Sequence, residues 1–189
     1  MKGNLFVISG PSGVGKGTLC KKAAEILPNI WVSVSMTSRE IRESETENVS
    51  YFYVSQQDFF DRIQKNEFLE YVEVYQGVYY GTPKGPVFEH LNAGDNVILE
   101  IDVDGAERVR QYTDACISIF IVPPSAEELK NRLTLRDKGA NKNYDERIAR
   151  AIEYEIPQAQ QFDYCVVNDD LDIAVQQLCD IIQAHSNKE

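Results

Sequence analysis

The sequence of 189 residues has no hydrophobic run long enough to cross a membrane. A spanning helix needs about 20 continuous apolar residues. The apolar run near the start, LFVI, is also too short for a signal peptide. The sequence therefore predicts a cytoplasmic protein without a membrane partner.

Basic residues are also scarce. Nineteen Lys and Arg stand against thirty Asp and Glu, which leaves a net charge of -11. A surface of this sign repels the phosphates of nucleic acids and of acidic lipids, so we expect no nucleic-acid partner. Any anion that the protein binds must be held by a local cluster of donors.

Metal-binding cysteine patterns are missing as well. The cysteines form neither a CxxC pair nor a Cys/His spacing, and they lie in apolar or periodic stretches, where cysteine behaves as a small hydrophobe. We expect them to be reduced and structural; they are Cys20, Cys116, Cys165 and Cys179. The chain contains no internal repeat or low-complexity tract, and its length fits one domain.

Five short apolar runs rich in β-branched residues alternate with helical patterns. The runs are nearly continuous, which is typical of strands buried on both faces of a parallel sheet. This order predicts a doubly wound α/β fold with a parallel five-stranded core. We expect strands at 5–9, 31–35, 97–101, 117–122 and 164–167, and helices at 16–27, 86–91, 106–112, 126–135, 144–162 and 171–184.

Two stretches interrupt the alternation. Residues 37–84 are polar, with the short strand YFYV, a helical pattern and the alternating FLEYVEV, and they predict a small, partly antiparallel insert. Residues 136–147 are charged, carry an arginine at each end and have the composition of a lid. We therefore divide the single domain 1–189 into a core (1–34, 85–124 and 156–189), an insert (35–84) and a lid region (125–155).

The segment SGPSGVGKGT follows the first predicted strand and opens the first predicted helix. It contains the GxxxxGK pattern, in which backbone N–H groups and the helix N-terminus hold phosphates and the lysine reaches the terminal ones. It predicts a P-loop for ATP. The expected ATP-binding residues are Gly10, Pro11, Ser12, Gly13, Val14, Gly15, Lys16, Gly17 and Thr18.

Gly17 departs from the common motif, in which a Ser or Thr that contacts Mg²⁺ follows the lysine. The hydroxyl comes one position later, at Thr18, and leaves the helix at a different angle. We expect Thr18 to be a weak metal ligand, with Mg²⁺ held mainly by water and by ATP.

A phosphate loop serves more than one class of protein. The segments DVDG and NKNYD suggest a GTPase switch, but the second has the spacing NKxxD and does not follow a buried strand. A phosphotransferase needs a second anion site that faces the loop. The insert offers arginine forks and tyrosine hydroxyls that suit a monophosphate, so we favour a phosphotransferase.

At this point the chain resembles the guanylate kinases. The matching segments, in order, are SGPSGVGKGT, SVSMTSREIRESE, YFYV, FLEYVEV, YYGT, ILEIDVDGA, IFIVPPSAEEL with NRLTLR, and VVNDD. Two departures stand out. The chain reads TSREIR where the family usually has Thr-Thr-Arg-x-Pro-Arg, and Glu100 stands where many relatives have aspartate.

The resemblance implies a role for each candidate side chain. Glu70 would recognise guanine, because a carboxylate can accept the N1–H and N2–H of guanine together, and adenine offers no such pair. Arg150 is expected to be an ordinary helix-surface arginine. The implied GMP-binding residues are Ser35, Arg39, Arg42, Tyr51, Glu70, Tyr80, Thr82 and Asp102; Asn168 would lie near adenine; and the catalytic residues would be Lys16, Arg39, Arg132, Arg136 and Arg147.

The implied reaction is Mg²⁺-dependent transfer of the γ-phosphoryl group of ATP to GMP or dGMP, giving ADP and GDP, in purine nucleotide metabolism. Two alternatives stay open: a non-catalytic guanylate-kinase-like module that binds protein partners, and a kinase for another nucleoside monophosphate. The sequence leaves the oligomeric state open, a homo-oligomer included.

Overall fold

The computed structural model describes residues 2–41, 45–75, 77–137 and 144–186. Every neighbouring pair of strands in its main sheet is parallel, which confirms the predicted five-stranded core. Across the sheet, the strands are β2 (Ile30–Val32), β7 (Asn96–Glu100), β1 (Leu5–Ser9), β8 (Cys116–Val122) and β9 (Tyr164–Val167).

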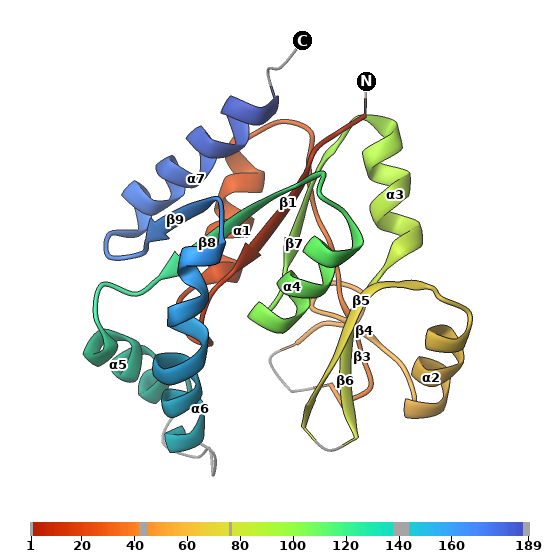
Figure 1. Cartoon of the computed structure of the whole chain (residues 1–189), viewed down its shortest axis with the longest axis horizontal. Helices are drawn as coiled ribbons and strands as arrows, with labels where there is room; N and C mark the ends of the chain where they lie inside the picture. Colours follow the sequence, from red (N-terminus) through yellow and green to blue (C-terminus); the bar gives the residue numbers. More distant parts are fainter. Residues whose placement is uncertain (1, 42–44, 76, 138–143, 187–189) are drawn as a thin grey trace.

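Helices cover both faces of this sheet, as a doubly wound fold requires. Figure 1 shows α1 (Lys16–Ile26) and α7 (Leu171–Ser186) on one side, and α3 (Lys84–Ala93) and α4 (Val103–Tyr112) on the other. Successive side chains of a strand point to opposite faces, so Phe6 of β1 packs in one core and Val7 in the other. This explains why β1 is apolar almost throughout and buried at every position.

The edge strand β9 departs from the prediction of strands buried on both faces. Only Val166 is buried in it, because β9 is the last strand of the sheet and has a neighbour on one side only. Cys165 of this strand is therefore exposed and is not the structural hydrophobe that we expected. Cys20 and Cys179 are buried, and all four cysteines are free thiols.

A second, smaller sheet is built between β2 and α3. It packs a core of its own, in which Phe59 of α2 (Gln56–Gln64) stacks on Phe68 with ring centroids 4.4 Å apart. Three strands form antiparallel pairs and β4 joins β3 in parallel. In spatial order the strands are β4 (Phe52–Tyr53), β3 (Met36–Thr37), β6 (Val78–Pro83) and β5 (Phe68–Tyr75).

The helices α5 (Ala126–Asp137) and α6 (Tyr144–Arg150) follow β8. We expected one helix over 144–162, but α6 continues as a π-helix (Ala151–Glu155) and then as a 3₁₀ helix (Ile156–Gln161). Pro157 has no N–H to donate to the residue four positions back, so α-helical bonding cannot continue there. Residues 138–143 of the predicted lid lie outside the described residues.

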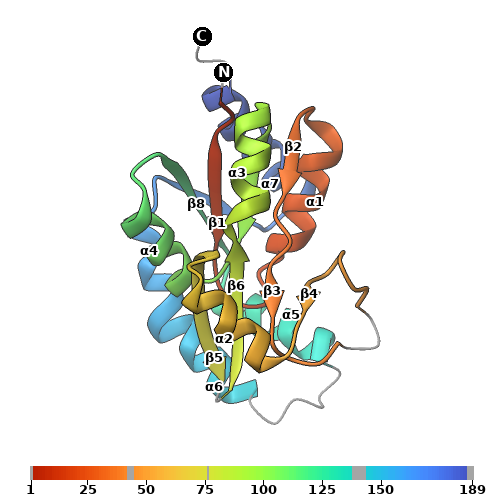
Figure 2. The same ribbon diagram turned by 90° about the vertical axis from the view of Figure 1, so that its right-hand side faces the viewer.

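The smaller sheet and the α5–α6 pair lie at the same end of the molecule. In Figures 1 and 2 this end is opposite to the start of β1 and the end of α7. Within the described ranges, no helix has the length and apolar character needed to cross a membrane.

Candidate active site

The phosphate loop connects β1 to α1 at the carboxyl edge of the parallel sheet, which is where open α/β sheets bind ligands. Gly13 and Gly15 have φ values of 84° and 99°, in the left-handed region that strains other residues. A Cβ on Gly15 would also lie 2.6 Å from the amide nitrogen of Asn168. The absent side chains let the loop backbone adopt a shape that can approach an anion closely.

Lys16 is the first residue of α1, and its ammonium group folds back over the loop. Nζ donates to the carbonyl oxygens of Gly10 at 2.6 Å and Pro11 at 3.2 Å. The first turn of α1 contains no acidic residue of its own, so the helix sequence places no carboxylate on the partial positive charge of its N-terminus. The loop therefore combines N–H dipoles with a lysine charge, as a phosphate site requires.

Gly17, which takes the usual place of a hydroxyl, faces the carboxylate of Glu100. A Cβ on Gly17 would lie 3.1 Å from Oε2 of Glu100. Burial raises the pKa of Tyr51, and the charges of Tyr80 and Glu100 add to this effect. The Glu100 carboxylate thus lies beside Gly17, and its charge acts on Tyr51. Thr18 is exposed on α1.

Asn168 and Arg132 support the loop. Asn168 is only 5% exposed, and its amide nitrogen donates to the carbonyl of Val14 at 2.7 Å. Arg132 of α5 donates to the carbonyl of Asn168 at 2.9 Å and to Glu128 at 2.8 Å. Both residues thus lie beside the loop, where Asn168 holds its backbone.

The helix α6 also contacts the loop, through Arg147. Arg147 donates to the hydroxyl of Ser12 at 2.7 Å, so the structure places this arginine at the phosphate loop. The side chain of Arg136 lies outside the described part of the chain.

Arg39 lies in a cluster of tyrosines and a carboxylate on the smaller sheet. It makes a two-pronged ion pair with Glu45, with N–O distances of 2.6 and 2.7 Å, and its Nε donates to the hydroxyl of Tyr80 at 2.8 Å. The guanidinium carbon lies 5.0 Å from the ring centre of Tyr51. The structure thus brings Arg39, Tyr51 and Tyr80 together, while Arg42 lies outside the described residues.

Glu70 and Thr82 form a buried polar pair on the adjoining strands β5 and β6. The Thr82 hydroxyl donates to Glu70 at 2.6 Å, and Glu70 is 5% exposed. Burial raises the pKa of Glu70 to about 7; the charge of Asp102 adds to the rise, and Thr82 and Arg108 oppose it. A buried carboxylate of this kind suits a ligand that brings its own N–H donors.

Asp102 connects this pocket to α4. Its carboxylate caps the helix by accepting the N–H of Gly105 at 2.8 Å, and burial raises its pKa. A Cβ on Gly105 would lie 3.0 Å from Glu70, so the first turn of α4 packs directly on the pocket. Ser35 is half-buried beside β3, where its carbonyl accepts the N–H of Phe52.

Two carboxylates of the site were missed by reasoning from the sequence. Glu45 occupies the fork of Arg39, and Glu155 lies buried near the phosphate loop. Each lies among other acids: Glu45 follows Glu40 and Glu43 in TSREIRESE, and Glu155 follows Glu153. No local pattern in the sequence therefore distinguishes either carboxylate from its neighbours.

The arrangement defines the class of the protein, the P-loop α/β proteins that bind nucleotides. A shikimate kinase structure from Bacteroides thetaiotaomicron shares this fold, with a TM-score of 0.50 and 17% identity over 95% of this chain and 98% of that one. At this level of identity the likeness concerns the fold alone.

Closer relatives narrow the class. The family model described as guanylate kinase matches residues 2–185. The chain is 48% identical to the guanylate kinase of Clostridium tetani, over 97% of this chain and 86% of the relative. It is 43% identical to that of Carboxydothermus hydrogenoformans, over 99% and 91%. A guanylate kinase structure from Anaplasma phagocytophilum has a TM-score of 0.81 and 31% identity, and the match covers 99% of this chain and 88% of that one. The chain belongs to the guanylate kinase family.

Proposed function

We propose that this protein transfers the γ-phosphoryl group of ATP to GMP or dGMP, giving ADP and GDP, in the purine nucleotide metabolism of the cytoplasm. The observation that carries the proposal for this chain is the buried pair of Glu70 and Thr82 beside an arginine–tyrosine cluster. Glu70 would accept the N1–H and N2–H of guanine, while Arg39, Arg42, Tyr51 and Tyr80 would bind the phosphate.

The phosphate loop would bind the donor. Its N–H groups and Lys16 would stabilise the charge that spreads over the transferred phosphoryl group, and Arg132, Arg136 and Arg147 would add positive charge from the lid region. Asn168 would keep the loop in shape through its bond to Val14 and border the adenine.

The acceptor needs no strong general base, because the phosphate of GMP is already an anion near neutral pH. Catalysis would therefore consist of positioning the two phosphates in line and neutralising charge. Closure of the insert (35–84) and the lid region (125–155) over the core would exclude water, which otherwise competes as the acceptor.

Mg²⁺ would supply charge neutralisation between the phosphates of ATP. The oxygen atoms of Thr18 and Glu100 suit this hard cation, and Mg²⁺ usually keeps several of its own waters. Among the described residues there is no group of three or more His, Cys, Asp or Glu side chains that could hold a metal by themselves. The donor set therefore fits an ion that arrives with ATP and is held only in part by the protein.

A coupled assay with ATP, Mg²⁺ and each nucleoside monophosphate tests the proposal. We expect GMP and dGMP to be phosphorylated, with GMP preferred over AMP by about 10⁴-fold in kcat/KM. Preferential use of AMP or UMP would refute the assignment of the acceptor. Absence of turnover together with absence of ATP binding by calorimetry would favour a protein-binding module instead.

A further inference from the structure

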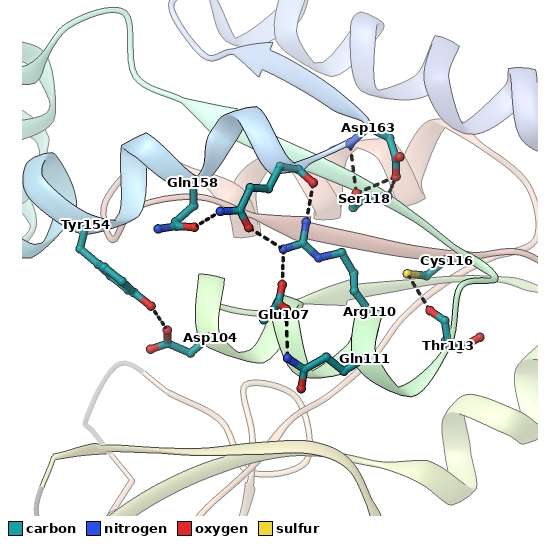
Figure 3. A network of polar contacts seen from close by, with 11 residues as sticks. Asp104, Glu107, Arg110, Gln111, Thr113, Cys116, Ser118, Tyr154, Gln158 and Asp163 are labelled. Atoms are coloured by element: carbon teal, nitrogen blue, oxygen red, sulfur yellow. Dashed lines mark hydrogen bonds and ion pairs between the residues drawn. The ribbon is translucent and has the colours of Figure 1, made fainter.

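Arg150, at the end of α6, makes two ion pairs that join separate parts of the molecule. One terminal nitrogen lies 2.6 Å from Oδ2 of Asp104 in the first turn of α4, and Nε lies 3.2 Å from Oε1 of Glu155. The other oxygen of Asp104 accepts the hydroxyl of Tyr154 at 2.6 Å, a contact that Figure 3 shows. The two oxygens of Asp104 are thus bonded to the last residue of α6 and to the π-helix that continues it.

The π-helix explains why these residues meet. In a π-helix the hydrogen bond spans five residues instead of four, so side chains five positions apart come to lie near one another. Arg150 precedes the π-helix and Glu155 ends it, a separation of five positions. A regular α-helix would bring residue 154, but not residue 155, over residue 150. The wide turn adds Glu155 as a partner of Arg150, while the guanidinium carbon of Arg150 still lies 5.0 Å from the ring centre of Tyr154.

Glu155 carries the connection to the phosphate loop. Its side chain is 9% exposed. Burial raises its pKa, and this rise is opposed by the charges of Lys16 and Arg150 and by a hydrogen bond from the backbone of Ser12. Ser12 is also the residue whose hydroxyl accepts Arg147. The segment from α6 to Glu155 therefore holds Ser12 at both its side chain and its backbone.

Asp104 carries the connection to the acceptor pocket. It lies in the turn of α4 that Asp102 caps, and the next residue, Gly105, packs against Glu70. A continuous series of contacts thus runs from Glu70 through the first turn of α4 to Arg150, and from Arg150 through Glu155 to Ser12.

The exposure of these groups argues against a mainly stabilising role. The side chains of Arg150 and Asp104 are 48% and 36% exposed, and ion pairs that water reaches to this degree contribute little to stability. We therefore look for the role of this ion pair in how it positions α4 relative to the segment that contacts the phosphate loop.

We propose that Arg150 is a positioning residue that couples occupation of the acceptor pocket to the shape of the phosphate loop. This proposal rests on the proposed function, since it needs two nucleotide sites. Binding of the monophosphate against the first turn of α4 fixes Asp104, Arg150 transmits that position to Glu155, and Glu155 holds Ser12 in the form that receives ATP. By linkage, ATP favours GMP binding by the same factor.

The test measures binding of a non-hydrolysable ATP analogue by calorimetry, with and without saturating GMP. In the unaltered protein we expect GMP to tighten analogue binding by about fivefold or more. Arg150→Met should bring this ratio close to one and leave the affinity for GMP alone unchanged. Arg150→Lys keeps the charge without the fork and should restore part of the ratio.

Arg110→Met is the matched control. Arg110 of α4 donates to Gln161 at 2.5 Å and pairs with Glu107, so it also joins α4 to the segment after α6, without a contact to the phosphate loop. Figure 3 shows this neighbouring network around Arg110 and Glu107. Both variants should unfold at similar temperatures, and only Arg150→Met should lose the coupling.

An unaltered ratio in Arg150→Met would overturn the proposal, as would an equal loss in Arg110→Met or a ratio of one in the unaltered protein. Failure of the proposed function has a different signature, because the unaltered protein would then not phosphorylate GMP in the coupled assay.

Discussion

The two proposed phosphate-binding regions of this protein differ in the groups that form them. The phosphate loop uses backbone, shaped by Gly13 and Gly15, with Lys16 as its only charged side chain. The acceptor region uses side chains from the smaller sheet and its connections, in which Arg39 is held by Glu45 and by the Tyr80 hydroxyl. A backbone site recognises phosphate in general, whereas a side-chain site can recognise one particular nucleotide.

The difference also concerns buried ionisable groups. The acceptor pocket depends on Glu70, whose pKa is raised to about 7. The residue proposed to select guanine is therefore also a buried ionisable group.

The largest effect should come from removing the lysine of the loop. Lys16→Met deletes the charge next to the phosphates, so we expect kcat/KM to fall by about 10³-fold or more. Steady-state assays of GDP formation measure this loss. Because Lys16 lies outside the acceptor pocket, the affinity for GMP alone should stay within about twofold, and normal turnover would contradict the role given to the loop.

A smaller loss should follow from Glu70→Gln in the acceptor pocket. The amide can accept one guanine N–H but presents a donor to the other, so we expect the ratio of kcat/KM for GMP over AMP to fall by about 100-fold. Thr82→Val is the companion variant, because it removes only the hydroxyl that supports Glu70, and it should have a weaker effect in the same direction. An unchanged ratio in Glu70→Gln would contradict the guanine contact.

The backbone of the loop can be tested with Gly15→Ala. The residue has φ 99°, and its Cβ would meet the Asn168 amide, so we expect about tenfold weaker ATP binding from about 1–2 kcal/mol of strain. Gly85→Ala is the control, since Gly85 lies in α3 and an added Cβ there meets nothing within 4 Å. Equal effects of the two substitutions on ATP binding would refute the requirement for glycine in the loop.

The smallest effect concerns stability and pH. An unfolded Glu70 ionises near its ordinary pKa of 4.5, whereas the folded one stays protonated up to about 7, so the folded state binds more protons between these values and loses stability as pH rises through them. The Glu70→Gln variant has no carboxyl group at this position to ionise, so it does not lose stability in this way. Its stability relative to the unaltered protein should be higher at pH 8 than at pH 4 by about 1–3 kcal/mol, measured by urea unfolding.

A difference in stability that does not change with pH would show that Glu70 has an ordinary pKa. Glu89→Gln, at an exposed acid on α3, is the matched control for the removal of one carboxylate by the same substitution.

The two regions also differ in how well the sequence predicts them. The parallel sheet and the loop follow from local patterns: apolar runs such as that of β1, and a motif in which each glycine has a fixed place. The pairing of Arg39 with Glu45 joins residues six positions apart, and no period in the sequence reveals it. The π-helix was also missed, because apolar spacing cannot distinguish a turn with one more residue from an α-helix; Pro157 was the available signal, and Arg150 was accordingly expected to be an ordinary surface residue.

The central claim is that separate sets of residues form the donor site and the acceptor site. Binding of each ligand alone tests this claim most directly. Calorimetry with GMP and with a non-hydrolysable ATP analogue should be carried out on Lys16→Met and Glu70→Gln. We predict that Glu70→Gln loses about tenfold or more in GMP affinity and keeps its affinity for the analogue, while Lys16→Met keeps its affinity for GMP. Parallel loss of both ligands in Glu70→Gln would contradict the claim.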